Sequence, residues 1–278
     1  MGFMSAANPE QATFWNEEGG RNWVAHQRSL DEQVRPFGEA AMDAAGFAVG
    51  ARLLDVGCGC GPTTIELAAR VGVDGSVLGV DIADIMIAAA EKAARESGPG
   101  ATNVSFRVAD VQVEKFEEEF DGVFSRLGVM FFADPTRAFA NLRSALRPGG
   151  KLAFAAWQTP SKNPWMIKPM MAMGEHVKLP PRPAPGEPGP FSFSDADLMR
   201  GYLTRAGFSA VTVAGLETQM KMGGGDIDAA ISFLMSAGRT DELIAQGGPD
   251  LAAAVRESMR QVIEPTMDAA AWIVTARG

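Results

Sequence analysis

Apolar and polar positions alternate in blocks along the central part of the chain. Short apolar runs of strand length are separated by longer segments in which apolar residues recur at helical spacing. The strand-like runs are 53–56, 76–81, 104–108, 121–125 and 151–156. The helix-like segments are 64–71, 84–97 and 136–146. Because strands and helices that alternate at this length form a parallel sheet with helices on both faces, the pattern predicts an α/β fold.

The flanking regions follow different patterns. Residues 1–11 are expected to be a frayed lead, and 14–34 have near-helical spacing. Pro36 is expected to end that segment and to begin a second helix over 36–45. After the core, a short helix kinked at Pro169 and six prolines between Pro180 and Pro190 interrupt the alternation. The remaining elements predicted are helices at 195–206, 226–237 and 249–263 and strands at 210–218 and 270–275.

These changes of pattern divide the chain into four parts. We expect an N-terminal helical lid at 1–48 and a ligand-binding core at 49–157. An insertion at 158–193 is expected to act as a substrate lid, and residues 194–278 complete the sheet and add helices.

A glycine-rich stretch joins the first strand of the core to its first helix. Residues 52–64 read R-L-L-D-V-G-C-G-C-G-P-T-T. Glycine lets the backbone take positive φ and approach a ligand closely, and the first N–H groups of the following helix face the turn. The spacing is G-x-G-x-G, whereas nicotinamide and flavin folds use G-x-G-x-x-G. The turn is therefore a candidate ligand cradle of a different kind.

Two acidic residues define which ligand the turn would accept. Asp55 lies two residues before the first glycine, and Asp81 ends the next strand, twenty residues after Gly61. A carboxylate at the end of the second strand suits the two hydroxyls of a ribose. Asp55 would repel a pyrophosphate but would tolerate an amino or sulfonium cation. The two acids together predict a nucleoside that carries a positively charged tail.

Charge and composition narrow the partners. The 278 residues carry a net charge of −9 and a sequence pI near 4.9. Nucleic acids and anionic membranes bind clustered cations, so neither is an expected partner. No apolar run approaches the roughly 18 residues of a membrane helix, and the first residues lack a signal-peptide pattern, which favours a cytoplasmic location. Cys58 and Cys60 are expected to fill the turn, with no disulfide and no metal.

Further motifs follow the glycine stretch in a fixed order. They read L-D-V-G-C-G-C-G at 54–61, V-D-I at 80–82, A-D-V at 109–111, F-D-G-V-F-S-R-L-G-V-M-F-F-A-D-P at 120–135 and L-R-P-G-G-K-L at 146–152. This set resembles the class I S-adenosylmethionine-dependent methyltransferases over most of the chain. The flanks F-W-N-E-E-G-G-R-N-W and A-A-W-I-V-T-A-R are similar to bacterial small-molecule members related to the quinone-biosynthesis methyltransferases.

The resemblance implies both a fold and a cofactor. The fold would be a Rossmann-like, doubly wound sheet of seven strands, mostly parallel with an antiparallel C-terminal strand. The cofactor would be S-adenosylmethionine, which leaves as S-adenosylhomocysteine, and no metal is implied. The residues implied to contact the cofactor are Trp23, Asp55, Gly57, Cys58, Gly59, Asp81, Ile82, Asp110, Val111, Ser125 and Arg126.

Within that set, each group of residues has an implied role. The glycine turn would lie against the methionine part, and Asp55 would orient the turn or the cofactor amine. Asp81 would hold the ribose, Ile82 would pack on the adenine face, and Asp110 with Val111 would receive the adenine edge. Ser125 and Arg126 would form the floor near the sulfonium. The family also implies that Trp15 and Trp23 belong to a lid over the cofactor.

The acceptor half of the site is expected to be apolar. Thioethers beside aromatic rings suit an apolar or aromatic small molecule. The candidate residues are Trp15, Met130, Phe131, Trp165, Met166 and Met170. After the fourth strand the chain reads S-R-L-G and lacks the Asn/Asp-Pro-Pro-Tyr clamp of amino-methylating enzymes that act on nucleic acids.

The predicted activity is methyl transfer to a small molecule, with an oxygen, carbon or nitrogen nucleophile undecided. His26 and His176 are the only bases that titrate near neutral pH, and neither is assigned a catalytic role. The alternatives are a protein that binds the methyl donor without transferring methyl, and an NAD(P)-dependent oxidoreductase. We expect a monomer or a homodimer.

Overall fold

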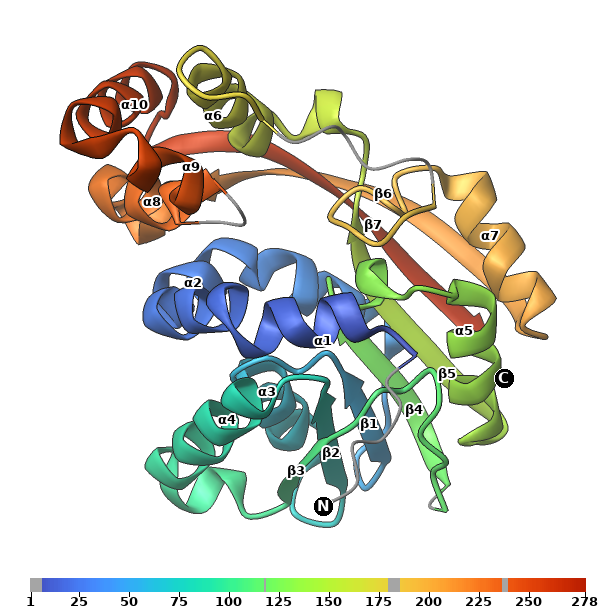
Figure 1. Cartoon of the computed structure of the whole chain (residues 1–278). Coiled ribbons are helices and arrows are strands. Elements are labelled where there is room, and N and C mark those ends of the chain that lie inside the picture. Colours follow the sequence, from blue (N-terminus) through green and yellow to red (C-terminus); the bar gives the residue numbers. More distant parts are fainter. Residues whose placement is uncertain (1–6, 118, 180–185, 237–239) are drawn as a thin grey trace.

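The computed structural model describes residues 7–117, 119–179, 186–236 and 240–278. Its centre is one sheet of seven strands in the order β3-β2-β1-β4-β5-β7-β6 (Figure 1). The strands are β1 (Arg52–Val56), β2 (Ser76–Asp81), β3 (Val104–Val108), β4 (Phe120–Arg126), β5 (Leu146–Trp157), β6 (Ser209–Lys221) and β7 (Thr266–Arg277). Strands β1 to β5 are parallel, and β7 runs antiparallel to both β5 and β6. The predicted Rossmann-like fold is confirmed.

Helices cover both faces of this sheet. The helices that follow the first, second and fourth strands are α3 (Pro62–Val71), α4 (Asp84–Glu96) and α5 (Pro135–Ser144), and α7 (Ala196–Arg205) precedes β6. Helices α3 and α4 lie on one side, and α5 and α7 pack together on the other (Figure 1). Side-chain caps fix the first turns of α5 and α7. Asp134 accepts a hydrogen bond from Arg137 N at the start of α5. Asp195 accepts from the N–H groups of Asp197 and Leu198 at the start of α7.

The N-terminal region differs from the sequence prediction. Helix α1 (Pro9–Asn16) begins inside the stretch expected to be frayed, and α2 (Glu18–Ala45) runs without a break through Pro36. A proline inside a helix costs about 3 kcal/mol. Phe37 and Ala41, in the turns after it, are fully buried, and this burial offsets the cost. The predicted reset at Pro36 is therefore wrong, because tertiary packing outweighs the local signal.

The C-terminal region builds a helical cap beyond the sheet. It consists of α6 (Pro164–Gly174), α8 (Ile227–Met235), α9 (Thr240–Gln246) and α10 (Gly248–Val262), which gather at the far ends of the long strands β6 and β7 (Figure 1). Helix α9 was not predicted from the sequence. Most of the proline cluster, 180–185, lies outside the described residues.

Four short 3-10 helices connect these elements. In the described residues they span Gly98–Ala101, Val129–Phe131, Pro160–Lys162 and Met222–Gly225. In the described part of the chain, no helix combines the length and the apolar character needed to cross a membrane.

Candidate active site

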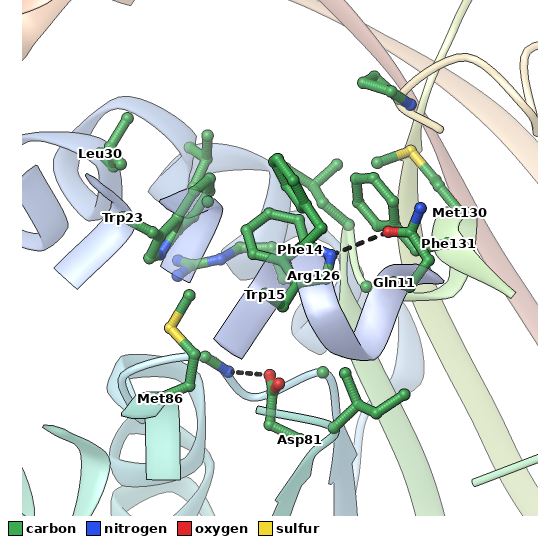
Figure 2. A pocket seen from close by; sticks show the side chains of 18 of the residues that line it. Gln11, Phe14, Trp15, Trp23, Leu30, Asp81, Met86, Arg126, Met130 and Phe131 are labelled. Atoms are coloured by element: carbon green, nitrogen blue, oxygen red, sulfur yellow. Dashed lines mark hydrogen bonds between the residues drawn. The ribbon is translucent and has the colours of Figure 1, made fainter. Parts of the chain in front are cut away.

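A cavity of about 510 Å³ opens beyond the carboxyl ends of β1, β2 and β4. Its volume falls within the range of about 300–1,000 Å³ that is usual for small-molecule sites. The sheet and the glycine turn form one wall, helices α1 and α2 form the opposite wall, and the helical cap supplies the remainder. Figure 2 shows Asp81 at one end of this space and Met130 with Phe131 at the other.

The glycine turn is held in a conformation that needs glycine. Gly57, Gly59 and Gly61 have φ values of 65°, 55° and 84°. A Cβ on Gly57 would lie 2.9 Å from the Cα of Gly128, so a side chain there would displace the neighbouring loop. The N–H groups of Gly57 and Cys58 both donate to the carbonyl oxygen of Val80, which ties the turn to the end of β2.

Asp81 closes the other side of the turn. Its Oδ2 accepts from Gly59 N at 2.9 Å, and its Oδ1 accepts from Ala83 N at 3.0 Å. Burial raises the pKa of this carboxyl, while the bonds from Ala83 and Gly59 act in the opposite direction. The side chain stays partly exposed and lines the cavity, so its remaining lone pairs can accept from ribose hydroxyls.

Asp55 does not reach the cavity. Its side chain is fully buried, and its Oδ2 accepts from the hydroxyls of Thr63 and Thr64, each at 2.7 Å. Its Oδ1 is buried and has no partner among the described residues. Burial raises the pKa of Asp55 to about 6, although the two threonine bonds lower it. Asp55 therefore does not line the cavity, and of its two predicted roles the geometry favours orientation of the turn.

Ser125 is a second predicted residue that does not line the cavity. It is fully buried, and its hydroxyl donates to the carbonyl oxygen of Val56 at 2.7 Å. Arg126, its neighbour, does line the cavity, and its Nη2 lies 2.7 Å from Oδ1 of Asp31 on α2. Successive side chains of a strand point to opposite faces, so only one of this pair can face the ligand.

The N-terminal segment covers the predicted adenine end. Ala7 N donates to Asp110 Oδ2 at 3.0 Å, and Gln112 N and Nε2 donate to Asp110 Oδ1. Directly after β2, the carbonyl oxygen of Ile82 accepts from Asn16 Nδ2 at 3.4 Å. Ala7, just ahead of α1, and Asn16, the last residue of α1, therefore contact the residues expected to hold the adenine.

The predicted acceptor residues all line the same cavity. They are Trp15, Met130, Phe131, Trp165, Met166 and Met170. The rings of Trp15 and Phe131 meet edge to face at 5.3 Å between centroids, and Trp165 packs on Trp157 at 5.2 Å. The remaining predicted cofactor residues, Trp23, Gly57, Cys58, Gly59, Ile82 and Val111, also line it.

Sequence reasoning missed several residues of this cavity. Among them are Phe14, Gln33, Met86 and Phe233. Gln33 and Phe233 come from segments far from the glycine turn in sequence, and only the folded chain brings them there. Phe14 carried a usable signal, because it lies next to Trp15 in the predicted lid.

The two histidines and the two cysteines show no arrangement for catalysis or metal binding. His26 Nδ1 lies 3.0 Å from the carbonyl oxygen of Asn22, His176 Nε2 lies 2.7 Å from Ser258 Oγ, and neither ring lines the cavity. Cys58 and Cys60 are free and buried. Burial raises the pKa of Cys60 to about 12 and also raises that of Cys58. In the ranges that the structure describes, no group of three His, Cys, Asp or Glu side chains could hold a metal ion.

The sheet order, the glycine turn and the acids beyond β2 and β3 together define the class I S-adenosylmethionine-dependent methyltransferase fold. Residues 53–150 match the family model described as a methyltransferase domain. Over these residues the chain is therefore similar to methyltransferase domains.

Relatives and solved structures agree with this class. Aklanonic acid methyltransferase of Streptomyces sp. strain C5 is 36% identical over 126 residues, which cover 45% of this chain and 56% of that protein. Nocamycin O-methyltransferase of Saccharothrix syringae is 34% identical over 141 residues, half of each chain. The chain thus spans about half the length of these curated relatives.

Among solved structures, phosphoethanolamine N-methyltransferase 2 of Haemonchus contortus, in complex with S-adenosyl-L-methionine, superimposes with a TM-score of 0.58 at 16% identity. The match covers 96% of this chain and 59% of that chain. At this identity the likeness concerns the fold.

Proposed function

We propose that the protein transfers a methyl group from S-adenosylmethionine to an apolar or aromatic small molecule. The observation that carries this proposal is the continuity of one cavity. It joins the turn and Asp81, which suit a nucleoside with a cationic tail, to a wall of aromatic and thioether side chains. A single space of this kind lets donor and acceptor meet without water between them.

The residues around the glycine turn suit the methyl donor in shape and charge. The turn excludes side chains at Gly57, so that the backbone can lie against a ligand. The Asp81 carboxylate is positioned for a ribose, and Arg126 at the end of β4 supplies a cation beside the turn, which suits the carboxylate of an amino acid. The cofactor, when bound, supplies a methyl group on a positively charged sulfur.

The contribution of the protein is alignment and exclusion of water. Trp15 on α1 and Phe131 on the loop after β4 pack against each other and close one side of the cavity. Met166 and Met170 on α6 line the acceptor half, where flexible thioethers adapt to a ligand surface. We propose that residues 1–48 and 158–193 act as lids in this way and that the core at 49–157 holds the donor.

The relatives support the kind of acceptor proposed. By their printed names, one acts on aklanonic acid and another is an O-methyltransferase for nocamycin. The net charge of −9 argues against nucleic acid as the substrate. The expected monomer or homodimer and the cytoplasmic location stay predictions.

Calorimetry and a turnover screen test the proposal in two stages. Titration with S-adenosylmethionine, S-adenosylhomocysteine and NADH separates the cofactor classes, and binding of NADH in place of both sulfur nucleosides would refute the proposal. Turnover is then followed as S-adenosylhomocysteine released from S-adenosylmethionine with phenols, hydroxyquinones, amines and thiols. Donor binding without release in any mixture would favour the alternative of a protein that binds the donor and transfers no methyl.

A further inference from the structure

Gln33 is a buried amide in the apolar wall of the cavity. It lies on α2 between Leu30 and Phe37, and its side chain is 5% exposed. Leu30, Gln33 and Val34 all line the cavity. One turn further along the helix, Phe37 packs on Trp157 at 4.9 Å between ring centroids. Trp157 in turn packs on Trp165, a predicted acceptor residue, so we assign this position to the acceptor half.

The orientation of the Gln33 amide is fixed by one neighbour. Gly223 N donates to Gln33 Oε1 at 3.3 Å. A backbone N–H can only donate, so the oxygen of the amide must face Gly223 and its NH2 group must face away. The NH2 group has no hydrogen-bond partner among the described residues, and the side chain lines the cavity.

The other buried amides differ from Gln33. Their NH2 groups all donate: Asn8 to Phe131 O, Gln112 to Asp110 Oδ1, Gln158 to Ala271 O, and Asn163 to Gln158 O, Thr159 O and Ala270 O. Within the described ranges, Gln33 is the buried amide whose NH2 group has no hydrogen-bond partner. Gln33 Nε2 is not among the fully buried atoms that lack a partner, so it keeps contact with the space of the cavity. A donor that faces an apolar cavity without a protein partner is available to a ligand. A ligand atom that accepts a hydrogen bond would be the partner that the Gln33 NH2 group lacks within the protein.

We propose that Gln33 Nε2 donates a hydrogen bond to an oxygen of the methyl acceptor, and that the acceptor is an aromatic molecule carrying a carbonyl, enolate or phenolate oxygen. This inference rests on the proposed function of the same cavity. The NH2 group can only donate at this site, so it selects a ligand atom with free lone pairs and rejects an ammonium group. The surrounding rings and aliphatic side chains select the apolar body of the ligand.

A pair of probes that differ in oxygen content tests this assignment. 2-Hydroxy-1,4-naphthoquinone, ionised at neutral pH, supplies the oxygens, and naphthalene supplies the same fused rings without them. Binding is read from quenching of tryptophan fluorescence, because Trp15, Trp23, Trp157 and Trp165 line the cavity. Each titration is made with and without S-adenosylhomocysteine.

The variant Gln33→Met removes the amide at nearly constant length. We expect it to weaken binding of the hydroxyquinone by about ten- to hundredfold, the range for a hydrogen bond to a charged group. Binding of naphthalene should change by less than about threefold. Gln27→Leu is the matched control, since Gln27 is on the same helix but does not line the cavity, and it should leave both affinities unchanged.

Gln33→Glu provides a second variant in case Gln33→Met fails to fold. The glutamate keeps an oxygen that accepts from Gly223 N, but as a carboxylate at pH 8 it offers no donor. We expect this variant to bind the hydroxyquinone more weakly while its affinity for naphthalene changes little. Equal changes for both probes, or no change for either, would overturn the inference. Failure to bind S-adenosylhomocysteine would instead contradict the proposed function, while the titrations without it still decide the role of Gln33.

Discussion

The buried carboxyl of Asp55 should make the stability of the protein depend on pH. Its pKa is raised from 3.8 to about 6, chiefly because burial disfavours the charged form. Between these two pH values the folded chain binds more protons than the unfolded chain, so the free energy of unfolding falls as pH rises through this window. Above about pH 7 the folded state carries the whole cost of the buried charge.

The structure sets the size of this effect. One pKa unit corresponds to about 1.4 kcal/mol, so the full shift corresponds to about 3 kcal/mol. Between pH 8 and pH 5 the group passes about one unit below its folded pKa, which predicts a gain of about 1.4 kcal/mol from Asp55 alone. The two threonine hydroxyls on Oδ2 are already counted in this pKa, because they lower it.

Asp55→Asn isolates this contribution. The amide oxygen can still accept from Thr63 and Thr64, and the buried charge is gone. We expect the stability of the variant relative to wild type to be about 1.4 kcal/mol higher at pH 8 than at pH 5, measured by urea unfolding at both values. Asp74→Asn, at an exposed position, is the control and should show no such difference. The reasoning fails if the Asp55→Asn variant differs from wild type by the same amount at both pH values.

Two further predictions concern the cofactor end. Asp81→Ala should weaken binding of S-adenosylhomocysteine by about 1.5–3 kcal/mol, because two ribose hydrogen bonds are lost; an unchanged dissociation constant in calorimetry would contradict the assignment. Gly59→Ala should cost about 1–2 kcal/mol of stability from its positive φ, since its Cβ would meet nothing closer than Trp23 Nε1 at 3.8 Å. Gly57→Ala should cost about 1–3 kcal/mol more, because its Cβ would lie 2.9 Å from Gly128 Cα, and equal costs in urea unfolding would argue against this close approach.

The amino-acid sequence by itself determined the core of the fold and the donor end of the site. Strands and helices that alternate at fixed length indicate a parallel sheet, and glycine is favoured where the backbone takes positive φ, as at Gly57. Asp81 follows from its position at the end of the second strand, because ligands bind beyond the carboxyl ends of parallel strands, and Asp110 follows from the resemblance of its motif. These are local signals, so they can be read without the folded chain.

Only the tertiary structure decided which side chains face the cavity. The core strands are buried on both faces, so the pattern of apolar residues does not tell which way Asp55 and Ser125 point, and both point away. Helix α2 continues past Pro36 because Phe37 is buried against the core. Local helix propensity could not predict this continuation. The amide of Gln33 is oriented by Gly223 N, 190 residues away along the chain, and this contact exists only in the folded protein.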